Sequence, residues 1–240
     1  MLKRGINPIF LVLAALLLFN AVRGGTFSNP GQWLMGIVYI LPGVVIAISF
    51  HEFAHGWVAY KLGDMTPKYQ GRLTVSPLAH IDPIGLLALI FAGFGWGVPV
   101  QINPNNFKHR RRDELLVSLA GVVMNLILAI IFGFIMKLIV LAAGNSLLTT
   151  TWGDITQHIV FGIIQINLVL MLFNLIPVPP LDGFSIISEI FNIKHTELYY
   201  RINQYGFIIL VAIILFGIAG RIITPGVSFF YNLILNYIVL

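Results

Sequence analysis

Residues 51–55 read HEFAH, and they lie inside an apolar run that extends from residue 36 to residue 60. Residues four positions apart share one face of a helix, so His51 and His55 are expected to point in the same direction. Two neutral imidazoles at this spacing can bind one zinc ion, and Glu52 lies beside them as a base for a metal-bound water molecule. A chance match is the alternative. Ionisable side chains in a membrane-length segment are costly unless they are paired or bound, which favours the metal site.

The composition of the chain is typical of a membrane protein. Of its 240 residues, 58% are hydrophobic and only 10% are charged, whereas soluble domains have about 25% charged residues. Several apolar runs reach the ~20 residues that a helix needs to cross a bilayer. The lack of cysteine excludes disulfides, thiolate metal sites and cysteine nucleophiles. We therefore expect an all-α membrane protein, a polytopic transmembrane helical bundle of about five to six spans in contact with the lipid bilayer.

The apolar runs define the expected spans and a single membrane domain over residues 1–240. Residues 6–22 resemble a signal peptide superficially, but the run is long for one and lacks an obvious cleavage site, so we expect a retained span. A short amphipathic helix is expected at residues 184–195. The core of the domain is expected at about residues 33–195, with additional C-terminal spans at about 203–240. The full spans are predicted at residues 6–22, 36–62, 113–141, 155–176, 205–219 and 227–240.

Residues 77–99 form a segment of a different kind. Its apolar middle is too short for a full crossing and is interrupted by glycines. Basic residues flank the segment on both sides, most densely in KHRRR at residues 108–112, and positive charge favours the cytoplasmic side. We therefore expect a re-entrant or β-like element near the active site. The same topology places HEFAH towards the cytoplasmic side of the plasma or inner membrane, and it explains the net charge of +5 without a nucleic-acid partner.

A catalytic zinc site needs a third protein ligand besides two histidines. Asp182 is the candidate, because it follows the proline-rich turn at residues 177–180 at the inner end of a predicted span. It is either a metal ligand or the N-cap of the next helix, and spacing alone does not decide between the two. Most of the other acidic residues lie beside basic residues or at helix ends and are expected to be solvated: Asp64, Asp113, Glu114, Glu189 and Glu197.

HEFAH together with NLIPVPPLDG at residues 174–183 resembles the site-2 protease family of intramembrane zinc metalloproteases, which pairs HExxH with a downstream NxxPxPxLDG. The resemblance implies one Zn²⁺ per chain, held by His51, His55 and Asp182, with Glu52 as the general base. It covers most of the chain, and the branch that it indicates is the compact bacterial one without a PDZ domain. The segments similar to that branch are GRLT at 71–74, PLAHIDP at 77–83, residues 99–107 and SLAG at 118–121; Val122 stands where the family usually has proline.

Four further polar residues have two interpretations each. Asn125 either forms an interhelical hydrogen bond or, as the resemblance implies, donates to the oxyanion of a scissile carbonyl. Asn174 has the same ambiguity, with helix C-terminal capping as the alternative. His80 and Asp82 either support a metal ligand or line a substrate channel, or they cap turns. The residues alone leave these alternatives open.

The resemblance implies a zinc metalloendopeptidase that hydrolyses peptide bonds in or next to transmembrane segments of membrane proteins. The expected partners are a transmembrane protein or peptide substrate and the lipid bilayer, and a second copy of the chain is a further candidate. A divalent-metal transporter is an alternative, and it predicts flux that depends on His51 and Asp182 rather than Glu52. A non-proteolytic membrane scaffold is another, although such a protein usually lacks a ligand or the base.

Overall fold

The computed structural model describes residues 29–92 and 95–240, and this part of the chain is helical without a strand. Five of its helices are long and apolar enough to cross a membrane: Pro30–Lys61, Arg110–Ala143, Thr151–Asn174, Glu197–Leu215 and Ile218–Val239. The predicted all-α, polytopic membrane fold is therefore confirmed. The span predicted at residues 6–22 lies outside the described residues.

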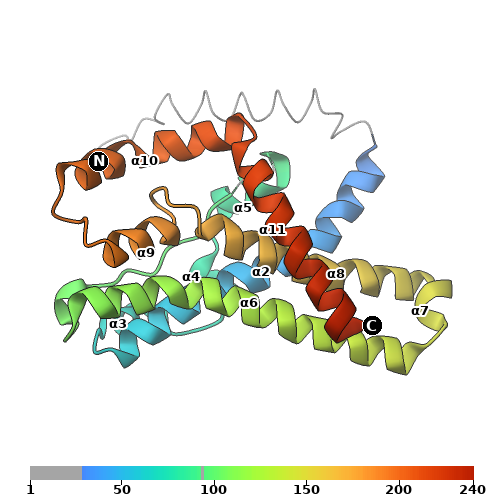
Figure 1. Ribbon diagram of the computed structural model, residues 1–240. Coiled ribbons are helices and arrows are strands. Elements are labelled where there is room, and N and C mark those ends of the chain that lie inside the picture. Colours follow the sequence, from blue (N-terminus) through green and yellow to red (C-terminus); the bar gives the residue numbers. More distant parts are fainter. Residues whose placement is uncertain (1–28, 93–94) are drawn as a thin grey trace, which may run out of the picture.

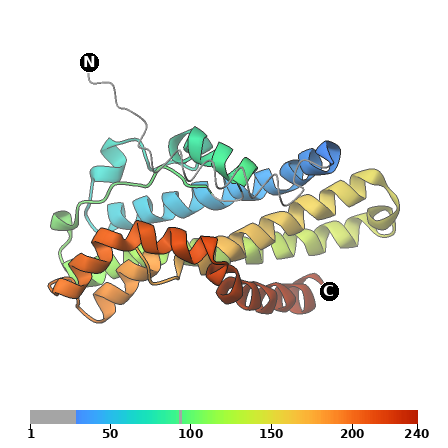
Figure 2. The ribbon, with the colours of Figure 1, turned by 90° about the horizontal axis from the view of Figure 1, so that it is seen from above.

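Three long helices form the centre of the molecule: α2 (Pro30–Lys61), α6 (Arg110–Ala143) and α8 (Thr151–Asn174). They pack against one another along their lengths (Figures 1 and 2). At a rise of 1.5 Å per residue they are about 36–51 Å long, which exceeds the hydrocarbon core of about 30 Å. The spans predicted here are confirmed, and each helix begins before the predicted first residue.

Side chains at the helix ends explain where the central helices begin. The Asn29 side chain accepts a hydrogen bond from the Gln32 N–H at 3.3 Å, and Pro30 occupies the first turn of α2. Thr150 caps α8 in the same way, accepting from the Gly153 N–H at 3.0 Å. A short helix, α7 (Ser146–Thr149), joins α6 to α8.

Between α2 and α6 the chain enters the molecule and turns back. It passes through α3 (Thr66–Tyr69), α4 (Pro77–His80), α5 (Pro83–Ala92) and a 3₁₀ turn, η1 (Pro104–Asn106). Ile81 pairs with Gly97 in an antiparallel bridge, and the Val98 N–H donates to the His80 carbonyl at 2.7 Å. The ten residues of α5 span about 15 Å, half of a bilayer core. Helix α5 is therefore too short for a full crossing, the re-entrant position of the segment stays a prediction, and its β-like character is limited to this one bridge in the described residues.

The C-terminal third is a short helix followed by a helical pair. These elements are α9 (Asp182–Ile190), α10 (Glu197–Leu215) and α11 (Ile218–Ile234), which ends in a π-helical turn, η2 (Leu235–Val239). The predicted break between residues 219 and 227 is wrong, because the chain turns at Gly217, whose φ is +67°. Pro225, which falls within the predicted break, lies inside α11.

Candidate metal centre

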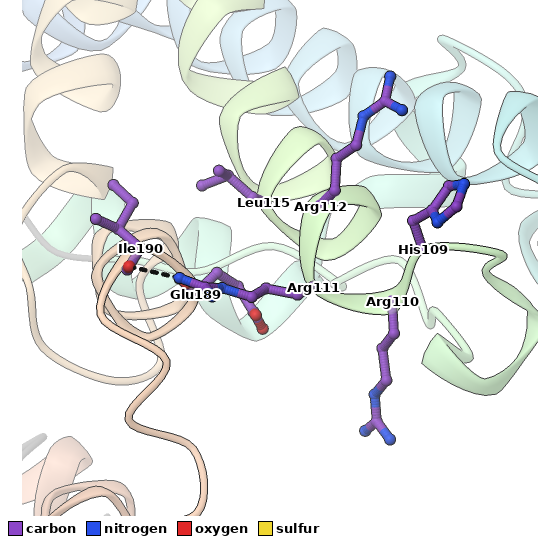
Figure 3. Close-up of a pocket in the computed structure, with 7 residues that line it drawn as sticks. All are labelled: His109, Arg110, Arg111, Arg112, Leu115, Glu189 and Ile190. Atoms are coloured by element: carbon purple, nitrogen blue, oxygen red, sulfur yellow. Dashed lines mark hydrogen bonds between the residues drawn. The ribbon is translucent and has the colours of Figure 1, made fainter.

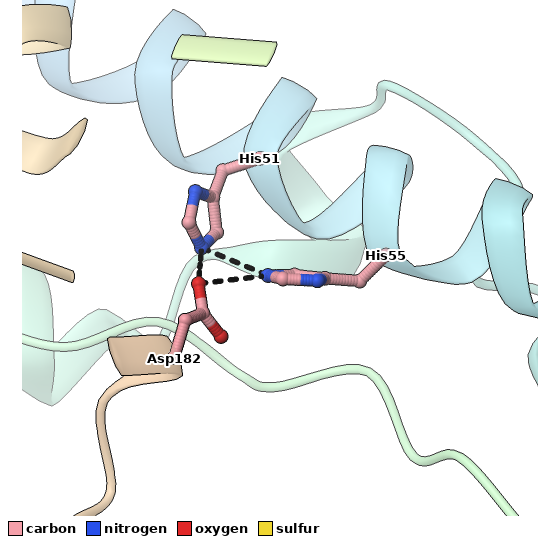
Figure 4. Close-up of side chains that lie close together, drawn as sticks. All are labelled: His51, His55 and Asp182. Carbon is pink, nitrogen blue, oxygen red and sulfur yellow. Dashed lines mark hydrogen bonds and ion pairs between the residues drawn. The ribbon is translucent and has the colours of Figure 1, made fainter. Parts of the chain in front are cut away.

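Three side chains from two distant parts of the sequence meet at the centre of the molecule (Figure 4). His51 and His55 lie one turn apart on α2, and Asp182 is the first residue of α9. The two Nε2 atoms are 3.0 Å apart. The Asp182 Oδ2 atom is 3.2 Å from His51 Nε2 and 3.3 Å from His55 Nε2. Asp182 therefore joins the two histidines, as expected of a third ligand.

Hydrogen bonds from α6 determine which nitrogen of each histidine carries the proton. His51 Nδ1 lies 2.6 Å from Asn125 Oδ1, and His55 Nδ1 lies 2.7 Å from the Val117 carbonyl oxygen. Both oxygens can only accept, so each imidazole donates from Nδ1. In the neutral form each Nε2 therefore presents a lone pair to Asp182 Oδ2.

This arrangement fits a divalent cation. Two imidazole lone pairs and a carboxylate oxygen converge within 3.3 Å, and Asp182 Oδ2 is buried without a hydrogen-bond donor. Such a group of acceptors is unfavourable unless something positive lies among them. A tetrahedral zinc ion with bonds of about 2.0–2.1 Å would place its ligand atoms about 3.3 Å apart, close to the observed distances.

Gly121 of α6 lies directly against the two imidazoles. A Cβ atom at this position would be 2.4 Å from His55 Nε2 and 2.5 Å from His51 Cε1. Residues 118–121 were identified from the sequence as similar to the compact branch of the family, and the contact of Gly121 with the histidines was missed. The signal that could have found it is the presence of Gly121 one turn before Asn125 on the same helix.

The turn before α9 explains how Asp182 reaches the histidines. Leu181 is the N-cap residue of α9, and no side chain caps the helix, so the capping alternative for Asp182 is not what its side chain does. A Cβ atom on Gly183 would lie 2.3 Å from the Leu175 carbonyl oxygen. The backbone of residue 183 thus lies so close to the Leu175 carbonyl at the end of α8 that only glycine fits after Asp182.

Glu52 follows His51 on α2, is half-buried, and binds a backbone N–H of the segment between α5 and η1. Its Oε2 atom accepts a hydrogen bond from the Val100 N–H at 2.9 Å. Val100 is buried and lies in the extended chain that leaves the re-entrant segment. The re-entrant segment is therefore in direct contact with the acidic residue of HEFAH.

Asn125 is fully buried, and both of its amide hydrogens are engaged. Nδ2 donates to Asn167 Oδ1 at 2.9 Å and to the Ala47 carbonyl at 3.3 Å. These contacts correspond to the interhelical alternative, and they leave no amide hydrogen for an oxyanion. Asn167, also fully buried, was missed by the sequence interpretation. The feature of the sequence that could have identified Asn167 is the presence of a polar residue within an apolar span.

The remaining predicted residues make local contacts. Asn174 Nδ2 donates to the Leu170 carbonyl at 3.1 Å, one turn earlier in α8. Asp82 Oδ1 accepts from the Gly85 N–H at 2.7 Å, which is a turn cap at the start of α5. His80 is fully buried, and its Nε2 lies 2.7 Å from the Thr74 carbonyl oxygen. No hydrogen bond in the described part of the chain joins these three side chains to the cluster.

Three acidic residues expected to be solvated are buried instead: Asp64, Asp113 and Glu189. Asp64 accepts hydrogen bonds from Thr66, Asn103 and Asn106 and so links the end of α2 to η1. Burial alone would raise the pKa of Asp64, but these hydrogen bonds outweigh it and lower the pKa below its ordinary value. The prediction was wrong because the contact between the two loops cannot be seen in the local sequence.

The combination of membrane-length helices with two histidines and an aspartate around one point is typical of a polytopic membrane protein with a metal site. The model of peptidase family M50 matches residues 39–217. The chain therefore belongs to peptidase family M50, the site-2 protease family, and this confirms the resemblance found in the sequence.

Curated relatives agree with the family assignment. The chain is 40% identical over 188 residues to "Putative zinc metalloprotease YwhC" of Bacillus subtilis, covering 78% of this chain and 84% of that protein. It is 26% identical over 239 residues to "Putative zinc metalloprotease Rip2" of Mycolicibacterium smegmatis, covering 94% of this chain and 86% of that protein. The Mycobacterium tuberculosis (strain H37Rv) protein of the same name is 27% identical over 219 residues, covering 87% of this chain and 80% of that protein. No solved structure matches the chain.

Proposed function

We propose that this protein is an intramembrane zinc metalloprotease that hydrolyses peptide bonds in or next to the transmembrane segments of membrane proteins. His51, His55 and Asp182 hold the zinc ion, and Glu52 is the general base. The observation that carries the proposal is the convergence of three acceptor atoms, two of them from histidines that donate from Nδ1. Membership of family M50 and relatives named as zinc metalloproteases support it.

Zinc held there polarises a substrate carbonyl and lowers the pKa of water towards ~7. Glu52 takes the proton from the attacking water molecule and passes it to the leaving amine. The Val100 N–H holds one carboxylate oxygen of Glu52 at 2.9 Å, which leaves the other oxygen for this proton transfer. Asn125 and Asn167 act as positioning residues, because they fix the proton of His51 on Nδ1 and its ring orientation.

The substrate reaches Glu52 in an extended form. The carbonyls of a helical substrate are shielded by hydrogen bonds along the helix, so the helix must unwind before cleavage. The extended chain around Val100 contacts Glu52, and an unwound substrate that pairs with it by strand addition would lie beside the base. We expect this site to lie towards the cytoplasmic side of a plasma or inner membrane, because positive charge such as that at residues 108–112 favours that side.

Reconstitution into liposomes tests this function against metal transport. We expect zinc-dependent cleavage of single-span peptides that carry helix-weakening residues near one end. We expect none with Glu52→Gln, which keeps the three ligands. Zinc flux that survives Glu52→Gln, without cleavage of any peptide, would instead indicate a transporter.

A further inference from the structure

Helix α6 sets the position of every member of the metal cluster. It holds His51 through Asn125 and His55 through the Val117 carbonyl, and both contacts are direct. Asp182 is held differently, because it stands on α9, a helix of nine residues that follows a proline-rich turn. The contact between α6 and α9 therefore determines where Asp182 lies relative to the two histidines.

Arg111, in the first turn of α6, binds the opposite end of α9 from Asp182 (Figure 3). Its Nε atom donates to the Glu189 carbonyl oxygen at 2.6 Å, and an Nη atom donates to the Ile190 carbonyl oxygen at 2.7 Å. The last carbonyls of a helix lack partners within the helix. A guanidinium group can satisfy two of them in fixed geometry, which sets both the axial position and the rotation of α9.

A partly buried ionic contact reinforces the same junction. Lys194, in the turn after α9, bridges the carboxylates of Glu114 on α6 and Glu189 on α9. Burial alone would lower the pKa of Lys194, but its hydrogen bonds to these carboxylates raise the pKa above its ordinary value. The lysine therefore stays charged, and α9 is tied to α6 at its C-terminal end by Arg111 and Lys194 together.

The arginines on either side of Arg111 do not take part. Arg110 Nε pairs with Glu114 Oε1 at 2.9 Å, and Arg112 makes no hydrogen bond or ion pair within the described residues. Figure 3 shows Arg111 extending to α9, while Arg110 and Arg112 extend away from it. The three arginines line an open cavity of about 530 Å³ to which none of the cluster residues contributes. Arg112 is thus a matched control of equal charge for Arg111.

We propose that Arg111 is a positioning residue for the metal site: by holding the C-terminal carbonyls of α9, it keeps Asp182 at the two histidines. The proposal rests on the proposed zinc site. Without Arg111, this end of α9 is held to α6 by the Lys194 bridge alone, so α9 is expected to shift along α6 and Asp182 with it. Loss of a group that hydrogen-bonds directly to a metal ligand typically costs about 10- to 100-fold in metal affinity, and we expect an effect up to that size for Arg111, which acts through the backbone of α9.

The test is a chelator competition that measures the zinc dissociation constant of the full chain in detergent, together with the visible spectrum of the Co²⁺-loaded protein. Arg111→Gln is expected to weaken zinc binding by up to about 100-fold and to change the Co²⁺ spectrum. Arg112→Gln is expected to leave both unchanged. Arg111→Lys, which keeps the charge but not the paired donors, is expected to give an intermediate loss and serves if Arg111→Gln does not fold.

A double-mutant cycle separates positioning from general loosening of the fold. Because Arg111 acts through Asp182, Arg111→Gln is expected to have no further effect on zinc affinity in an Asp182→Ala background. An equal loss in both backgrounds would overturn the proposal, as would identical zinc affinities for Arg111→Gln and Arg112→Gln. In those cases the proposed function stands. Lack of zinc in the folded wild type would overturn both.

Discussion

Replacement of Gly121 by alanine places a methyl group where the two imidazoles lie. The new Cβ would be 2.4 Å from His55 Nε2 and 2.5 Å from His51 Cε1, whereas atoms in ordinary contact are about 3.5 Å apart. Both rings must therefore move by about 1 Å, because Gly121 is inside a 34-residue helix whose backbone is fixed on both sides.

The expected effect is on the metal rather than on the helix. Alanine is favoured over glycine in a helix by about 1 kcal/mol, and this offsets part of the overpacking cost of about 1–3 kcal/mol. The displaced imidazoles, in contrast, no longer converge with Asp182. We expect zinc affinity to fall by about 10- to 100-fold, while the protein remains folded.

Chelator competition in detergent measures the affinity, and Gly133→Ala is the matched control. Gly133 is on the same helix, and its added Cβ would meet two side chains away from the cluster, lying 2.6 Å from Ile234 Cγ2 and 3.5 Å from Ile238 Cγ2. Gly133→Ala is expected to bind zinc as the wild type does. Wild-type zinc affinity in Gly121→Ala would refute the inference that α6 lies against the metal-binding face of the histidines.

Three further substitutions probe the rest of the site. Asn125→Leu is expected to weaken zinc binding by about 10- to 100-fold because His51 Nδ1 loses its acceptor. Asn125→Asp keeps that acceptor but places an oxygen against the Ala47 carbonyl and Asn167 Oδ1, so it is expected to lose less zinc affinity than Asn125→Leu; equal losses would contradict the role of the acceptor. Gly183→Ala is expected to lower both thermal stability and zinc affinity, because its Cβ would lie 2.3 Å from the Leu175 carbonyl oxygen. Asp64 has a pKa below its ordinary value of 3.8, so its contribution to stability is present above that pH and is lost as the pH falls through the lower, folded value. Asp64→Asn is therefore expected to lower the thermal midpoint at neutral pH. The thermal midpoint of this variant is also expected to fall less than that of the wild type as the pH is lowered; an equal fall in both proteins would show that Asp64 does not contribute.

Sequence reasoning succeeded where the information is local. The spacing of His51 and His55 determines that they share a helix face, and the length of each apolar run determines whether it can cross a membrane. The short, glycine-interrupted run at residues 84–94 indicated an element too short for a full crossing for the same reason. These features depend on periodicity and length, which any single sequence displays.

The features that sequence reasoning missed depend on contacts between helices. Asp64 and Glu189 are buried because distant segments close over them, and Gly121 touches the imidazoles because α6 crosses α2 at that residue. Arg111 looked like one more residue of a topological charge cluster, although it binds α9. The boundary between the last two spans was misplaced, because the chain turns at Gly217 and the helix then continues through Pro225.

The most direct test of the account is the amount of zinc bound per chain in the detergent-purified wild type, Glu52→Gln and Asp182→Ala. One zinc ion is predicted in the wild type and in Glu52→Gln, because Glu52 is the base and not a ligand. Asp182→Ala is predicted to lose zinc or to bind it weakly. A folded wild-type protein without tightly bound metal, or an Asp182→Ala protein that binds zinc as the wild type does, would contradict the three-ligand site.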